Sequence, residues 1–248
     1  MKRILFTTVS LGVLGLMSPA LAADLPTYGK APVVAPLEYN WSGVYVGVFG
    51  GGGWGNHNIN NGTPTGFAPY LFTYDTSGAV AGGEVGYNYQ TGRYLFGVEA
   101  TGFWSGIKGN DASQQLGLID ADNLRDAFTL VARGGITVDR LLLFFTGGWA
   151  YGNTLHTNTN PGVGVDQFSI LRSGLTAGGG IAYALSDNVI GKFEYRYFDF
   201  GAYNRPGVGL AALTPNGLAP YTINSTYSIV TVGIDFKFGG PAAVVAKY

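Results

Sequence analysis

A strict alternation of apolar and polar residues marks the last strand-like run of the chain, residues 226–238. One set of alternate positions holds Ser228, Val230, Val232, Ile234, Phe236 and Phe238, and the other set holds Ile229, Thr231, Gly233, Asp235 and Lys237. A period of two predicts a β-strand with two different environments. A soluble sandwich fits this strand, and so does a membrane barrel whose apolar face meets lipid and whose charges face the lumen.

The same period recurs along the chain and predicts eight strands, at about 41–54, 78–90, 94–106, 125–138, 141–154, 173–185, 189–200 and 226–238. The connections between them alternate between long polar segments and short turns. A sandwich gives no reason for this alternation, whereas membrane barrels have short periplasmic turns and long external loops. The chain therefore predicts an all-β fold, an eight-stranded antiparallel up-and-down transmembrane β-barrel over 41–238, with both termini in the periplasm.

The first 22 residues have the pattern of a secretory signal peptide. Lys2 and Arg3 precede an uncharged run, and small residues follow it, so we predict cleavage between Ala22 and Ala23. A membrane anchor is the alternative, but the run is short and broken by polar residues. The Pro-containing residues 23–40 are interpreted as a flexible periplasmic leader, and 239–248 as a periplasmic extension.

Composition narrows the chemistry. Only 12% of residues are charged, there are 41 glycines, and there is no cysteine, which excludes disulfides and thiolate chemistry. Without Lys2 and Arg3 the formal net charge moves from −1 to −3, so nothing suggests a nucleic-acid partner.

Charged residues fall on the predicted inner face of several strands. They are Glu84, Glu99, Arg133, Lys192, Glu194, Arg196, Asp235 and Lys237. An unpaired buried charge costs several kcal/mol, so we expect these four acids and four bases to form a plug of salt bridges. The alternative is a narrow ion path, because inward glycines such as Gly86 and Gly180 leave room for water.

Aromatic residues cluster near the ends of the predicted strands, as interfacial girdles require. We expect Trp41, Tyr87, Tyr89, Tyr94, Phe96, Phe236 and Phe238 on the periplasmic side, and Trp54, Trp104, Trp149, Tyr151 and Phe200 on the outer side.

Both histidines, His57 and His156, fall in segments predicted to be long external loops. Such residues can bind a metal or haem iron, but a solvated polar role is the more common one. His156 with Asp166 and Ser169 could form a catalytic set, but loops of this composition contain such residues by chance, which is the favoured explanation. We predict no enzyme activity, no metal and no cofactor.

Several segments resemble a known family. They are 22–26, 30–32 and 41–47 around the first strand, the glycine run 50–55, the run 193–197, and the ending 232–238. The chain resembles the small outer-membrane β-barrel proteins of alphaproteobacteria, which include surface antigens and haemin-binding members. The resemblance implies a barrel assembled by the outer-membrane insertion machinery, which reads a terminal strand ending in Phe. Here Gly239 to Tyr248 follow Phe238, and Pro241 fits poorly in a strand.

The expected function is structural: a barrel that supports envelope integrity and presents surface loops. A narrow porin-like channel for small solutes and a surface binder of haemin or host molecules are the alternatives. The expected partners are outer-membrane lipid, lipopolysaccharide and the insertion machinery. Haemin binding is carried by no matched motif and is not assigned to His57 or His156.

Overall fold

A computed structural model describes residues 38–61, 71–110, 119–160, 164–205 and 221–239. The predicted signal peptide 1–22, its cleavage site at Ala22 and Ala23, the leader up to residue 37 and the tail from residue 240 lie outside these described residues. Among the described residues, no helix is long and apolar enough to cross a membrane.

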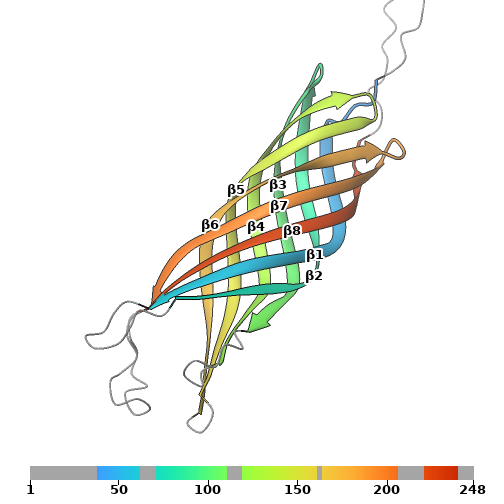
Figure 1. Ribbon diagram of the computed structural model, residues 1–248. Helices are drawn as coiled ribbons and strands as arrows, with labels where there is room; N and C mark the ends of the chain where they lie inside the picture. The colour runs from blue at the N-terminus through green and yellow to red at the C-terminus, as the bar shows by residue number, and fades with distance from the viewer. Residues whose placement is uncertain (1–37, 62–70, 111–118, 161–163, 206–220, 240–248) are drawn as a thin grey trace, which may run out of the picture. The chain divides into compact units, whose positions relative to one another are not determined.

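The described chain forms eight antiparallel strands that close into one barrel (Figure 1). The strands are β1 (Gly43–Asn61), β2 (Leu71–Thr91), β3 (Tyr94–Asn110), β4 (Ile119–Val138), β5 (Leu141–Asn160), β6 (Gly164–Ala184), β7 (Val189–Arg205) and β8 (Tyr221–Lys237). Each strand pairs with its neighbour in sequence, and β1 pairs with β8. The predicted up-and-down barrel is confirmed, and closure gives every strand a neighbour on both sides through the middle of the barrel.

Three tight turns join β2 to β3, β4 to β5 and β6 to β7 at one end of the barrel, here named the short-turn end. The first has Gly92 at a φ of 57° and the second has Asp139 at 50°. Glycine adopts this left-handed region without steric cost, and aspartate tolerates it better than most residues. The opposite end, which the four other connections span, is named the long-loop end.

The strands are longer than the sequence predicts. They run 17–21 residues, and most of the added length lies at the long-loop end. Only about 9–11 residues of a tilted strand cross a bilayer. Backbone pairing continues toward this end: β6 stays paired with β5 as far as Gly164, and β7 with β8 as far as Arg205, whereas the pairing of β6 with β7 ends at Leu175 and Asp199. The polar segments that were predicted as loop starts are therefore strand.

The outer wall is apolar, as predicted. Val232, Ile234 and Phe236 on β8, and Phe238 directly after it, are 46–62% exposed, whereas Asp235 is 2% exposed. Trp54, Trp104, Trp149 and Tyr151 are exposed toward the long-loop end, and Tyr87, Tyr89, Tyr94 and Phe96 toward the short-turn end. The apolar face of the sheet therefore points outward and the charged face points into the lumen, which is the arrangement of a membrane barrel.

Candidate functional site

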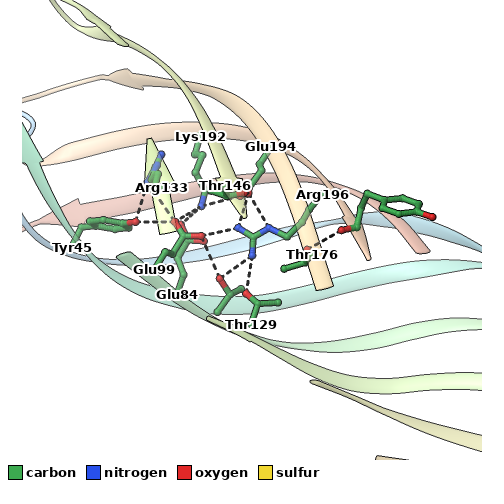
Figure 2. A network of polar contacts seen from close by, with 12 residues as sticks. Tyr45, Glu84, Glu99, Thr129, Arg133, Thr146, Thr176, Lys192, Glu194 and Arg196 are labelled. Atoms are coloured by element: carbon green, nitrogen blue, oxygen red, sulfur yellow. Dashed lines mark hydrogen bonds and ion pairs between the residues drawn. The ribbon is translucent and has the colours of Figure 1, made fainter. Parts of the chain in front are cut away.

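The middle of the lumen holds a compact layer of ionisable side chains from four strands (Figure 2). It comprises Glu84 on β2, Glu99 on β3, Arg133 on β4, and Lys192, Glu194 and Arg196 on β7, each 1–7% exposed. We call these six residues the charge layer. The alternation of each strand brings them to one level, because side chains two apart share a face.

Glu99 lies at the centre of the charge layer. Arg196 Nη2 lies 2.7 Å from Glu99 Oε1, and Arg133 Nη1 and Lys192 Nζ each lie 3.4 Å from Glu99 Oε2. The Tyr45 hydroxyl donates a hydrogen bond of 2.8 Å to the same oxygen. Three cations and a phenol thus surround one buried carboxylate, which offsets the cost of taking it out of water.

The other two carboxylates of the charge layer bracket the Lys192 ammonium. Its Nζ pairs with Glu84 and lies 3.3 Å from Glu194 Oε2. Oxygens of Glu84, Glu99 and Glu194 come within 4.8 Å of one another, close enough to share a metal ion. The ammonium already provides the positive charge among them, so this cluster is satisfied as an ion-pair network.

Threonine hydroxyls complete the network, and sequence reasoning missed them as members. Arg196 Nη1 donates to Thr129 Oγ1 at 2.9 Å and to Thr101 Oγ1 at 3.2 Å, and Thr146 Oγ1 donates to Glu194 at 3.2 Å. The alternation of the strands could have predicted their inward position, because Thr129 is four residues from Arg133 and shares its face.

Two of the eight predicted network residues lie outside the charge layer. Asp235 is buried beside Gly47, opposite Glu84 across β1, and its Oδ1 accepts no hydrogen bond from the described residues. Lys237 donates instead to the Asn40 carbonyl at the short-turn end, where its Nζ lies 4.3 Å from the centre of the Tyr39 ring. The charge layer together with Asp235 therefore holds four carboxylates and three cations, not a balanced set of eight.

Residues just before β1 close the short-turn end. The Trp41 indole donates to the Asp139 carbonyl at 3.1 Å, and the Tyr39 hydroxyl donates to the Asp187 carbonyl at 3.1 Å. Their rings pack edge to face, 5.0 Å apart. Burial raises the pKa of Tyr39 to about 12, with a further contribution from Asp187. We call Tyr39–Ser42 the mouth plug.

The mouth plug corrects two sequence predictions. Trp41 is 1% exposed and points into the barrel, so it does not belong to the outer girdle. The described end of the predicted flexible leader, including Tyr39, is packed and hydrogen-bonded. Aromatic residues suit both the outer girdle and a plug in the barrel mouth. Only the contacts of Trp41 and Tyr39 with distant turns show that these two residues belong to the plug.

An aromatic layer fills the lumen on the long-loop side of the charge layer. It contains Phe103, Phe198, Phe200, Tyr227 and Ile229, all buried, with Phe49 packed against them. Phe200 is 5% exposed, so its predicted place in the outer girdle is wrong. The parity of β7 explains this: Phe200 is an even number of residues from Arg196 and therefore shares its inward face.

The two histidines are strand residues with buried imidazoles, which corrects their predicted place in external loops. His57 lies on β1 and His156 on β5, at 0% and 1% exposure. The Nδ1 atoms of the two rings lie 3.2 Å and 2.7 Å from the two carboxylate oxygens of Asp122 on β4. Tyr74 also donates to Asp122.

These contacts define a polar cluster inside the long-loop end. Arg172 on β6 donates to Ser225 Oγ at 2.6 Å, and Ser225 also lies 2.9 Å from His57 Nδ1. The predicted set of His156, Asp166 and Ser169 is not assembled, because His156 is buried and Ser169 is exposed. The side chain of Asp166 lies outside the described part.

Inward glycines leave little free space, contrary to the expectation of room for water. A Cβ at Gly86 would lie 2.3 Å from the Tyr45 hydroxyl oxygen, and one at Gly180 would lie 2.9 Å from the Phe144 ring. A cavity of about 20 Å³ borders Glu84, Arg196, Phe49 and Ile229. That volume holds about one water molecule.

Comparison with known proteins agrees with this geometry. The family model for the outer membrane protein beta-barrel domain matches residues 8–238.

The chain belongs to this outer-membrane β-barrel family. It is 30% identical to the 25 kDa outer-membrane immunogenic protein of Brucella abortus over 238 residues, covering 93% of this chain and 96% of the relative. It is 31% identical to the 31 kDa outer-membrane immunogenic protein of Brucella melitensis, covering 88% and 93%. The resemblance to alphaproteobacterial outer-membrane barrels and the outer-membrane location are thereby confirmed.

Among solved structures, the outer membrane protein OprG from Pseudomonas aeruginosa has a TM-score of 0.45 at 13% identity, covering 80% of this chain and 97% of that chain. A likeness at this level carries no argument about function. The lumen of this chain contains four groups of side chains: the mouth plug, the charge layer, the aromatic layer and the polar cluster.

Proposed function

We propose that this protein is a non-conducting structural barrel that stabilises the outer membrane and displays its long connections at the cell surface. The supporting observation is that the lumen is occupied in series by the mouth plug, the charge layer and the aromatic layer. In this proposal the short-turn end and both termini are periplasmic. The names of the Brucella relatives, which are immunogenic outer-membrane proteins, support surface display.

The proposal also covers partners and chemistry. Its partners are outer-membrane lipid, lipopolysaccharide and, during assembly, the barrel-insertion machinery; nucleic acid is not among them. No enzyme activity is proposed, since the described side chains form no accessible nucleophile–base pair. Haemin is not proposed as a ligand, because the His57 and His156 imidazoles are buried against Asp122.

Single-channel recording on the purified protein in planar bilayers tests the closed lumen. We expect no steady conductance above the lipid background. The double variant Tyr39→Ala/Trp41→Ala removes the mouth plug but leaves the charge layer, so it is also expected to stay closed. Steady conductance of the unmodified protein would reject the structural proposal in favour of a narrow porin-like channel.

A further inference from the structure

A groove of about 460 Å³ lies on the barrel wall near the long-loop end, where β3, β4 and β5 run side by side. Two rows of paired residues cross it: Lys108, Asn123 and Leu155 in one, and Asn110, Ala121 and Thr157 in the other. The volume falls within the range of small-molecule sites, about 300–1,000 Å³.

The lining of this outer groove mixes polar and apolar groups. The ammonium of Lys108, the amides of Asn110 and Asn123 and the hydroxyl of Thr157 lie beside Ala121 and Leu155. Asp122 also borders the groove, but its carboxylate is buried and paired with the two histidines of the polar cluster. The Asn123 Oδ1 atom is buried, and it accepts no hydrogen bond from any part of the chain that the structure describes. A buried acceptor without a donor costs about 1–3 kcal/mol, so a bound donor would be favoured there.

A second cation lies beside the groove. The pairing of β3 with β4 and of β4 with β5 shifts register around Arg125, and its side chain is exposed next to the buried Leu124. Among the side chains that the structure describes, Lys108 and Arg125 are the exposed cations of the long-loop half, and neither forms an ion pair with a described residue. Both cations therefore lie in this one sector of the wall, together with the exposed Asp126, whose Oδ1 accepts a hydrogen bond from Asn153.

The position of the groove along the membrane normal indicates which layer of the membrane surrounds it. Trp104, 76% exposed, lies on the same strand as Lys108 and four residues closer to the membrane centre. Tryptophan marks the membrane–water interface. Four residues span about 13 Å along a strand, which is about 10 Å along the membrane normal at the usual tilt. Lys108 therefore reaches the layer of lipid headgroups.

We propose that this groove binds the phosphorylated sugar headgroup of an outer-leaflet lipid. Lys108 and Arg125 neutralise a phosphate, and Asn123 accepts a hydrogen bond from a sugar hydroxyl or amide. The placement in the outer leaflet rests on the proposed orientation of the barrel, whereas the affinity for a phosphorylated sugar does not. The phosphate accounts for the two cations and the sugar for the unpartnered acceptor.

Native mass spectrometry of the full-length, detergent-solubilised protein tests this site with diphosphorylated lipid A as the probe. We expect Lys108→Gln/Arg125→Gln to weaken binding at least about tenfold, the scale of one lost charge-assisted contact. The matched control Arg93→Gln/Arg140→Gln removes two cations from the short-turn end and is expected to bind as the unmodified protein does. Heat-modifiable gel migration verifies that each variant is folded.

Two further arms separate the parts of the proposal. Dephosphorylated lipid A is expected to bind weakly and equally to the protein and to both double variants. Phosphatidylglycerol, which has a phosphate but no amino sugar, is expected to bind more weakly than lipid A, and Asn123→Ala is expected to remove this preference. Equal binding of lipid A by Lys108→Gln/Arg125→Gln and the control, or equal binding of the two lipids by the unmodified protein, would overturn the site.

Discussion

At the scale of single residues, Glu99 and Glu84 share one buried layer but differ in what they contact. The Glu99 carboxylate contacts the side chains of Arg133, Lys192, Arg196 and Tyr45. Glu84 pairs with Lys192 and lies across Gly47 from Asp235. Removing the Glu99 carboxylate leaves cations unmatched, whereas removing the Glu84 carboxylate leaves the charge layer and Asp235 with three carboxylates and three cations.

We therefore expect Glu99→Gln to lower the free energy of unfolding by about 3–5 kcal/mol, the usual cost of breaking a buried ion pair. Glu84→Gln, a matched change of the same chemistry, should cost clearly less. Urea unfolding of the protein reconstituted in lipid vesicles measures both. Equal losses would show that charge balance does not govern the stability of this layer.

The docking of the mouth plug is expected to depend on pH, because burial raises the pKa of Tyr39 to about 12. An unfolded tyrosine has a pKa near 10. The folded state thus favours the uncharged phenol, so its contribution to docking is complete below about pH 10 and is lost as the pH rises through about 12.

Acrylamide quenching of Trp41 fluorescence measures this release, in a variant whose other three tryptophans are replaced by Phe. Quenching should increase between pH 10 and 12. In Tyr39→Phe, which has no ionisable hydroxyl, the transition should be absent. An unchanged transition in that variant would assign it to another group.

At the scale of elements, the alternation of side chains along β8 places one set on the outer wall and the other in the lumen. Val232 is 62% exposed on the outer wall, midway along the apolar stretch from Val230 to Phe236. Val232→Arg should destabilise the barrel by about 2–4 kcal/mol, because a charge at the membrane midplane is costly. Val232→Leu is the control and should change stability little. Vesicle-based unfolding provides the measurement, and a small loss for the arginine would place this face away from lipid.

The same period predicted which residues of each strand share a face but not where strands end. Alternation is visible only while one face is in lipid, so β1 and β5 were predicted to stop before His57 and His156. The strands continue because neighbouring backbones go on exchanging hydrogen bonds whatever their side chains are. The histidines are therefore lumenal, and Asp122 joins them from a segment that was predicted to be loop.

At the scale of the whole molecule, the orientation of the barrel is open to a direct test, because the chain has no cysteine of its own. Asn204→Cys places a thiol near the long-loop end of β7, and Ser186→Cys places one in the turn before it. A membrane-impermeant maleimide should label the first on intact cells. The second should react only after the outer membrane is permeabilised. The reverse pattern would invert the proposed orientation without affecting lipid A binding in detergent.

The sequence by itself determined the barrel, its strand number and the inward face that holds Glu84, Glu99, Arg133, Lys192, Glu194 and Arg196. These properties follow from local periodicity and from the lengths of connections. Only the tertiary structure decided that Trp41 is a plug residue and that Lys237 leaves the charge layer for the mouth. Those outcomes depend on contacts between residues as much as 197 positions apart, which no local pattern encodes.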